Sequence, residues 1–358
     1  MDLYNNTLQN IIGPDKKIMT STKNKLDNLI KPIGSLGRLE DISIKVSGIT
    51  GKIKNTIDKK CIIIMASDNG ICEDGVSCSP KEITYEQTLN FTKGITGINI
   101  LAKHASSDIK IIDIGIDSEI NHPDIIDKKI RKGTSNISKG PAMSRFEAIK
   151  AIETGIEIVT SLVKEGYNLL GTGEMGIGNT STSSAITMCL TQCSSDLAVG
   201  KGAGLTNEMF VHKKNIIDTA IKVNDPNRND PIDVLSKLGG FDIAGLVGCY
   251  LGAAVNRVPI LIDGLISAAA ALVAYNINPL LRDYMIPSHK STEPSYSLIL
   301  QTIKLEPMLH LNMRLGEGTG CPLAFNIIEA ALKITNEMAS FQNISTDNGF
   351  LIDIDKNE

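Results

Sequence analysis

The sequence predicts an α/β fold with a parallel sheet and flanking helices. From residue 61 onward, apolar runs of strand length alternate with longer helical patterns, which is typical of this fold class. The run 61–66 (Cys-Ile-Ile-Ile-Met-Ala) contains no polar residue, as expected of a strand buried on both faces of a parallel sheet. Residues 1–55 lack such a run, and the apolar residues of 36–49 recur at helical spacing. A helical N-terminal segment therefore precedes the sheet.

The strands and helices are expected in alternation. We predict strands at 61–66, 109–115, 168–170 and 258–262. Two S-x-x-E patterns indicate capping boxes, Ser144 with Glu147 before a helix to 165 and Ser79 with Glu82 before a helix toward Phe91. Further helices are predicted at 179–193, through 213–214, and at 242–256, 265–274 and 322–339. The carboxyl ends of parallel strands form the ligand crevice, so the aspartates that follow two strands, Asp68 and Asp263, are candidate site residues.

Composition favours a cytoplasmic protein with small-molecule partners. The net charge is −4, the isoelectric point is about 5.8, and Lys and Arg are scattered, which argues against nucleic-acid binding. The seven cysteines form no CxxC pair and are interpreted as reduced thiols. The apolar stretch 243–274 is interrupted by polar residues, and neither half reaches the roughly 20 residues that a membrane span needs. His289 and His310 have no partner at ligand spacing, so we expect no metal site and treat both as ordinary polar histidines.

Two glycine-rich stretches each contain one glutamate and precede a helix. They are 171–180 (GTGEMGIGNT), with Glu174, and 315–320 (LGEGTG), with Glu317. Glycine permits positive φ and close approach of a ligand to the backbone, and a helix N-terminus directs its amides toward anions. A turn does not require the carboxylate. The repeated pattern therefore predicts a chemical role for both glutamates.

The first stretch also matches the G-x-G-x-x-G pattern of dinucleotide-binding proteins. Gly171, Gly173 and Gly176 have the required spacing, and Asp196 lies 20 residues beyond Gly176. Glu174 would, however, place a negative charge beside a pyrophosphate, which costs on the order of 1 to 4 kcal/mol. A mononucleotide with a single phosphate fits better. An oxidoreductase using this pattern remains the alternative enzyme, and a nucleotide sensor without turnover is the alternative non-enzyme.

Basic and backbone-rich elements are available for a phosphate. The segment 200–204 (GKGAG) is rich in glycine, Lys213 offers a point charge, and Arg314 a bidentate fork. Two carboxylates near a sugar phosphate suggest chemistry at an anomeric carbon. One would accept a proton, and the other would stabilise developing positive charge.

Five motifs that occur in order carry a family resemblance. They are 31–40 (KPIGSLGRLE), 66–71 (ASDNGI), 79–84 (SPKEIT), 173–180 (GEMGIGNT) and 315–320 (LGEGTG). Over about residues 20–340, the chain resembles the nicotinate-nucleotide:dimethylbenzimidazole phosphoribosyltransferases of cobalamin lower-ligand assembly. The resemblance implies transfer of ribose phosphate from nicotinate mononucleotide to dimethylbenzimidazole, with inversion at the anomeric carbon and without metal or redox cofactor.

The resemblance also implies roles for individual residues. Glu317 would be the general base, and Glu174 would support the cationic transition state or orient the acceptor. The residues implied for the nucleotide and its phosphate are Gly176, Asn179, Gly202, Ala203, Lys213, Asp242, Asp263 and Arg314. Those implied for the acceptor are Ser79, Gln87, Met175, Ser291 and Leu315.

The resemblance implies a homodimer with a large Rossmann-like domain and a small helical domain built from N- and C-terminal segments. The expected division is 1–55 for the N-terminal part of the small domain, 56–320 for the catalytic domain, and 321–358 for a returning helix and polar tail. Relatives that attach adenine or phenolic compounds would share the catalytic loops, so the preferred acceptor base stays open.

Overall fold

A six-stranded parallel sheet forms the centre of the protein. The computed structural model describes residues 2–202 and 204–341. The strands are β1 (Lys60–Ser67), β2 (Asp108–Gly115), β3 (Ile125–Asp127), β4 (Leu169–Met175), β5 (Ile260–Ile262) and β6 (Met285–Pro287). Their order is β3-β2-β1-β4-β5-β6, and every neighbouring pair is parallel. The order reverses between β1 and β4, where the crevice of such sheets lies. The predicted Rossmann-like α/β fold is confirmed.

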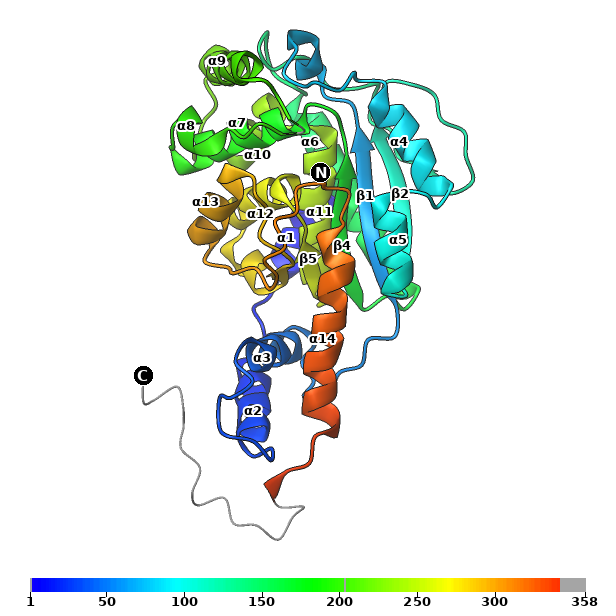
Figure 1. Ribbon diagram of the computed structural model, residues 1–358, viewed down its shortest axis with the longest axis vertical. Coiled ribbons are helices and arrows are strands. Elements are labelled where there is room, and N and C mark those ends of the chain that lie inside the picture. The colour runs from blue at the N-terminus through cyan, green and yellow to red at the C-terminus, as the bar shows by residue number, and fades with distance from the viewer. Residues whose placement is uncertain (1, 203, 342–358) are drawn as a thin grey trace.

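Helices cover both faces of the sheet (Figure 1). One face carries α6 (Arg145–Lys164), α11 (Phe241–Val255) and α12 (Leu265–Ile277), and the other carries α4 (Ile83–Thr92), α5 (Gly97–His104) and α14 (Gly320–Glu337). Side chains of β1 alternate between the two layers: Ile63 and Met65 pack in one core, and Ile62 and Ile64 in the other. A strand buried on both faces must be apolar throughout, which explains the unbroken run that predicted it.

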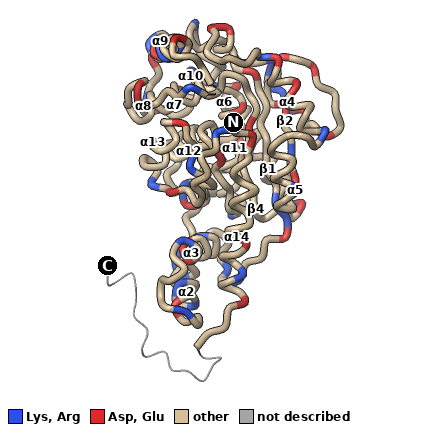
Figure 2. The backbone as a smooth tube through the Cα atoms, in the orientation of Figure 1, with Lys and Arg blue, Asp and Glu red and all other residues tan. Residues whose placement is uncertain are grey.

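The remaining elements connect these strands and helices. They are η1 (Gly70–Asp74), α7 (Asn179–Thr191), α8 (Ser195–Ala198), α9 (Asn207–Asn224), α10 (Pro231–Leu238), η2 (Pro279–Asp283) and α13 (Pro294–Ile303). None of the helices in the described ranges has the length and apolar character to cross a bilayer. Basic and acidic residues are interspersed along the chain, as the scattered sequence pattern predicts (Figure 2).

A smaller helical part lies at one end of the molecule (Figure 1). It contains α2 (Lys16–Asp27) and α3 (Arg38–Thr50), which pack against α14. The Ile30 amide donates to the Ala339 carbonyl at 3.0 Å, and the Phe341 amide donates to the Asn28 carbonyl at 3.1 Å, so an N-terminal and a C-terminal segment meet there. By contrast, α1 (Asp2–Asn10) packs on α6 and α11. The helical segment 1–55 is thus divided between the two parts. The expected polar tail, 342–358, lies outside the described residues.

The first half of the first glycine–glutamate stretch, residues 171–175, is a strand where a loop was predicted. The strand expected over 168–170 continues as β4 to Met175, so Glu174 lies within a strand. Its glycines allow close packing here: a Cβ on Gly171 would lie 2.7 Å from Cys321 Cβ, and one on Gly173 would lie 2.7 Å from the Glu317 carbonyl oxygen. The prediction was wrong because glycine is unfavourable in strands and so weakens the sequence pattern of one. Glycine is nevertheless needed here, because neighbouring segments pack too closely to leave room for a side chain.

The two predicted capping boxes differ in outcome. At α6, the Ser144 amide donates to Glu147 Oε2 at 2.7 Å and the Glu147 amide donates to Ser144 Oγ at 3.2 Å, which confirms the prediction. The Ser79 box is wrong, since α4 begins only at Ile83 and its N-cap residue is Glu82. Ser79 is thereby left free to line the cavity described next.

Candidate active site

A cavity of about 330 Å³ opens at the carboxyl ends of the strands. Its walls come from the segments that follow β1, β4, β5 and β6, and from the loop before α14. The residues expected in the site that line it are Ser79, Gln87, Glu174, Met175, Gly176, Asn179, Gly202, Ser291, Arg314, Leu315 and Glu317. The structure therefore brings together residues separated by more than two hundred positions in sequence.

The loop that carries Glu317 has an unusual backbone. Gly316, Glu317 and Gly318 have φ values of 85°, 61° and 88°. The glycines adopt such angles readily, whereas a non-glycine residue there costs of order 1–3 kcal/mol. The positive φ predicted for this glycine-rich stretch is confirmed, and it extends to the glutamate itself. Surrounding contacts must hold Glu317 in this conformation.

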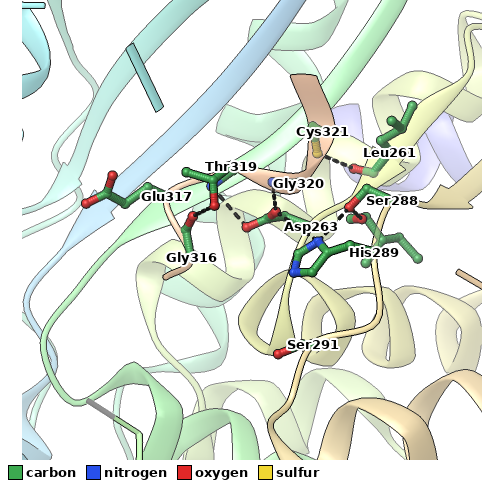
Figure 3. Close-up of polar contacts among 12 residues, drawn as sticks. Leu261, Asp263, Ser288, His289, Ser291, Gly316, Glu317, Thr319, Gly320 and Cys321 are labelled. Carbon is green, nitrogen blue, oxygen red and sulfur yellow. Dashed lines mark hydrogen bonds and ion pairs between the residues drawn. The ribbon is translucent and has the colours of Figure 1, made fainter. Parts of the chain in front are cut away.

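Asp263 provides the main contacts that hold the loop (Figure 3). It directly follows β5 and is 1% exposed. Its Oδ2 accepts the Gly318 amide at 3.0 Å, and its Oδ1 accepts the Gly320 amide at 2.7 Å. It does not line the cavity, although it was expected in the nucleotide site. The geometry makes Asp263 a positioning residue for the Glu317 loop.

The Glu317 carboxylate is buried and only partly satisfied. Gln87 Nε2 donates to its Oε1 at 2.7 Å, while Oε2 is inaccessible to solvent and has no hydrogen-bond partner in the described chain. Burial raises the pKa of Glu317, and the Gln87 hydrogen bond and the Ile98 amide limit the rise. A desolvated carboxylate with one free oxygen is a stronger base than a solvated one. It is well suited to accept a proton inside the cavity.

Glu174 lines the cavity and belongs to an acidic cluster with Asp242. Asn179 Nδ2 donates to Glu174 Oε2 and, at 3.0 Å, to Asp242 Oδ2. Burial, followed by the Asp242 charge, raises the pKa of Glu174 to about 8, and burial raises that of Asp242 to about 6. This environment favours the protonated form of Glu174 at neutral pH in the ligand-free protein. Asp242 does not line the cavity and acts on it through Asn179.

The opposite end of the cavity is cationic. Lys213 of α9 is 1% exposed, and its Nζ donates to Thr180 Oγ1 at 2.9 Å. Burial lowers the pKa of Lys213 to about 8, and the Glu293 charge opposes that shift. A Cβ on Gly202 would lie 3.6 Å from Lys213 Nζ, so backbone and ammonium adjoin. Arg314 lines the cavity, whereas Lys213 lies behind Thr180 and Gly202, which line it. Ala203, also expected here, lies outside the described residues.

Sequence reasoning missed several cavity residues, among them two with titratable side chains, His289 and Glu293. Both follow β6, a three-residue strand too short to be recognised from its pattern. His289 was interpreted as an ordinary polar histidine. The His289 Nδ1 atom lies 3.1 Å from Ser288 Oγ and 3.7 Å from Asp263 Oδ1. Ser288 Oγ also donates to the Ile262 carbonyl at 2.8 Å. Had β6 been recognised, the crevice rule would have indicated the segment that follows it.

Thiols and metal ligands are not grouped in the site. All seven cysteines are free, and burial raises the pKa of the Cys72 thiol to about 12. Within 2–202 and 204–341, no cluster of three or more His, Cys, Asp or Glu residues has metal-binding geometry. The titratable groups that line the cavity are Glu174, Glu293, Glu317, His289 and Arg314, and Lys213 lies beside it.

Comparisons with known proteins agree on one family. Residues 11–345 match the family described as phosphoribosyltransferase. The chain is 54% identical to the nicotinate-nucleotide–dimethylbenzimidazole phosphoribosyltransferase of Clostridium tetani, over 99% of this chain and 98% of that protein. It is 55% identical to the protein of that name from Clostridium acetobutylicum, over 94% of this chain and 96% of that protein.

A solved structure supports the same assignment. The crystal structure of nicotinate-nucleotide-dimethylbenzimidazole phosphoribosyltransferase from Thermus thermophilus superposes with a TM-score of 0.88 at 33% identity. The match covers 93% of this chain and 100% of that one. The resemblance inferred from the five motifs is confirmed. The chain belongs to the nicotinate-nucleotide–dimethylbenzimidazole phosphoribosyltransferase family.

Proposed function

We propose that the protein transfers ribose phosphate from nicotinate mononucleotide to dimethylbenzimidazole, giving α-ribazole phosphate and nicotinate in cobalamin nucleotide-loop assembly. The names of its relatives support these substrates. The observation that carries the proposal is the Glu317 carboxylate, whose Oε2 is buried without a partner in the described chain, in a cavity that also contains a cationic end. A proton acceptor and a phosphate site in one cavity match the needs of this reaction.

Glu317 is the general base of the proposed reaction. Its carboxylate accepts the proton of one benzimidazole nitrogen while the other nitrogen attacks the anomeric carbon. Gln87 holds Oε1 at 2.7 Å and so fixes the direction of the free oxygen. The bond between the anomeric carbon and the nicotinate nitrogen breaks as the new carbon–nitrogen bond forms. Such base catalysis typically contributes about 10²- to 10⁴-fold.

The leaving group requires no acid. In the donor, the nicotinate nitrogen is a pyridinium, and it leaves as a neutral ring that takes the bonding electron pair. Attack from the opposite face inverts the β linkage to α. Glu174, whose pKa is raised to about 8 in the ligand-free protein, would lose its proton beside the positively charged donor. As a carboxylate it would then stabilise the cationic transition state.

The remaining residues have binding roles in this proposal. Gly176, Gly202, Lys213 and Arg314 hold the phosphate, and Ala203 extends that segment. Asn179 and Asp242 hold Glu174 in place, while Asp263 holds the Glu317 loop. The acceptor contacts Ser79, Gln87, Met175, Ser291 and Leu315, all of which line the cavity.

The test is a product assay on purified protein. Nicotinate mononucleotide is incubated with and without dimethylbenzimidazole, and nicotinate and ribazole phosphate are separated by chromatography. We expect both products in equal amounts, and only with acceptor present. Nicotinate release without acceptor would indicate a hydrolase, and donor binding without turnover would favour a sensor. Adenine and phenolic acceptors in the same assay define the acceptor range.

We also propose a homodimer that acts in the cytoplasm. Four large apolar side chains, Ile95, Ile100, Leu311 and Leu315, are each at least half exposed, and Leu315 also lines the cavity. Such side chains are typical of an interface when they are gathered on one surface. Light scattering should give twice the chain mass of 38.5 kDa. Seven free thiols are consistent with a reducing compartment.

We further propose that the small domain consists of α2, α3 and the distal part of α14. The contacts of α3 with both α2 and α14, and the backbone hydrogen bonds between residues 28–30 and 339–341, support this division. Limited proteolysis tests it, because cleavage should concentrate in the connection between α3 and β1.

A further inference from the structure

We propose that the Glu293 carboxylate occupies the phosphate end of the cavity before the donor arrives and competes with the donor phosphate for it. The inference rests on the phosphate site assigned under the proposed function. Neither the sequence motifs nor the family comparison singles out this residue. In this proposal, Glu293 weakens the binding of the donor phosphate, whereas Lys213 strengthens it.

The position of Glu293 is not explained by its helix. It is the N-cap residue of α13, where acidic side chains usually accept amides of the first turn, yet its side chain makes no cap hydrogen bond. Its own amide donates to Ser291 Oγ at 3.3 Å. The carboxylate extends instead toward the glycine-rich segment before α9. A Cβ built on Gly200 would lie only 1.9 Å from Glu293 Oε2 and 2.8 Å from its Cδ.

Glu293 is half-buried, and its carboxylate is poorly satisfied. Oε2 has no accessible surface and no hydrogen-bond partner in the described chain. A buried oxygen without a partner costs free energy, so its persistence requires a reason. Glu293 lines the cavity together with Gly202, Thr180 and Arg314. Its charge therefore lies among the groups that would receive the phosphate.

The charges around Glu293 supply that reason. Burial raises the pKa of Glu293, and the charges of Lys213 and Arg314 and the Gly202 amide act in the opposite direction. Lys213 itself is buried, and its close partner, Thr180, is uncharged. A buried ammonium without an anion is unfavourable. Glu293 provides the compensating negative charge while the cavity is empty of phosphate.

The arrangement is poised for exchange. No Lys213–Glu293 ion pair within 4.0 Å occurs among the described residues, although the Glu293 charge acts on Lys213. The carboxylate is therefore a nearby negative charge that no direct ion pair with Lys213 holds. A phosphate dianion brings more charge and more acceptor oxygens to the same cations. The two anions repel each other, so phosphate binding requires Glu293 to rotate away or to take up a proton. Removing its charge should consequently strengthen anion binding.

Isothermal titration with sulfate tests the inference at pH 7.5. Sulfate is a suitable probe because it is a dianion at this pH. We expect Glu293→Gln to bind sulfate at least about tenfold more tightly than the wild-type protein, and to lower KM for nicotinate mononucleotide. Glu293→Asp keeps the charge and should lie closer to wild type. Glu157→Gln removes an exposed carboxylate on α6, which pairs with Lys128, and should leave sulfate affinity unchanged.

The outcomes separate this inference from the proposed function. Equal or weaker sulfate binding by a folded Glu293→Gln protein, checked by thermal melting, would overturn the inference, because a merely structural residue weakens binding when altered. If Glu293→Gln does not fold, Glu293→Ala is titrated in its place under the same expectation. Tighter sulfate binding without transferase turnover by the wild type would support the inference and overturn the function. Turnover without the affinity gain would overturn the inference alone.

Discussion

Asp263→Asn tests how the Glu317 loop is held. The carboxylate accepts the Gly318 amide with one oxygen and the Gly320 amide with the other, at 3.0 and 2.7 Å. Asparagine has one acceptor oxygen, so its NH₂ group would face one of these buried N–H donors. An unsatisfied buried amide costs about 1–3 kcal/mol. The loop can relieve that cost by relaxing Glu317 from its φ of 61°, which moves the base out of position.

The expected result follows from these energies. A loss of about 1–3 kcal/mol in the transition state lowers kcat by about 5- to 150-fold, because each 1.36 kcal/mol is tenfold. KM for the donor should change little, since the phosphate end of the cavity is formed by other segments. Steady-state kinetics with varied donor at saturating acceptor measure both constants.

A control substitution removes a carboxylate charge at a helix cap outside the cavity. Asp230 accepts the amides of Ile232 and Asp233 at 3.1 and 3.2 Å with one oxygen, Oδ1, at the start of α10, so asparagine can keep both bonds there. Asp230→Asn should lower stability slightly and leave kcat unchanged. If Asp263→Asn retains kcat within twofold of wild type while remaining folded, the positioning role assigned to Asp263 is wrong.

Two further predictions concern β4. Because the pKa of Glu174 is raised to about 8, the folded protein holds a proton that the unfolded chain releases above about pH 4.3. The stability that this proton contributes is present at low pH and is lost as pH rises toward 8, so the melting temperature should fall more steeply between pH 5 and 9 in wild type than in Glu174→Gln. Gly173→Ala would place Cβ 2.7 Å from the Glu317 carbonyl oxygen and should lower both stability, by about 1–3 kcal/mol, and kcat. Gly140→Ala, where a Cβ meets nothing within 4 Å, is the control, and equal behaviour of the two variants would contradict the packing argument.

The sheet was predictable where strands are long and apolar. Every residue of β1 is buried, so nearly all of its positions require apolar side chains and the strand is recognisable from the sequence. The strands β3 and β6 contain three residues each and leave no periodic pattern to detect. β4 was predicted too short because Gly171 and Gly173 resemble a loop, whereas their lack of a side chain serves contacts with Cys321 and Glu317. Those contacts are long-range and are invisible in local sequence.

The candidate site was likewise predictable only where a local sequence pattern indicates the residue. The two glutamates were recognisable because an isolated carboxylate among glycines has no structural purpose in a turn. The roles of the buried aspartates were not, because the sequence does not reveal that Asp263 binds a loop more than fifty residues later or that Asp242 acts through Asn179. Glu293 follows a strand that was missed and resembles an ordinary helix cap.

The most direct test of the account is Glu317→Gln. Glutamine keeps the shape of the side chain and an oxygen to accept the Gln87 hydrogen bond, but it cannot take the benzimidazole proton. Single-turnover kinetics and calorimetric titration with nicotinate mononucleotide separate chemistry from binding. The account predicts a fall in the rate of nicotinate release of about 10²- to 10⁴-fold, with donor affinity within about twofold of wild type. An unchanged rate would contradict it and would require another group to serve as the base.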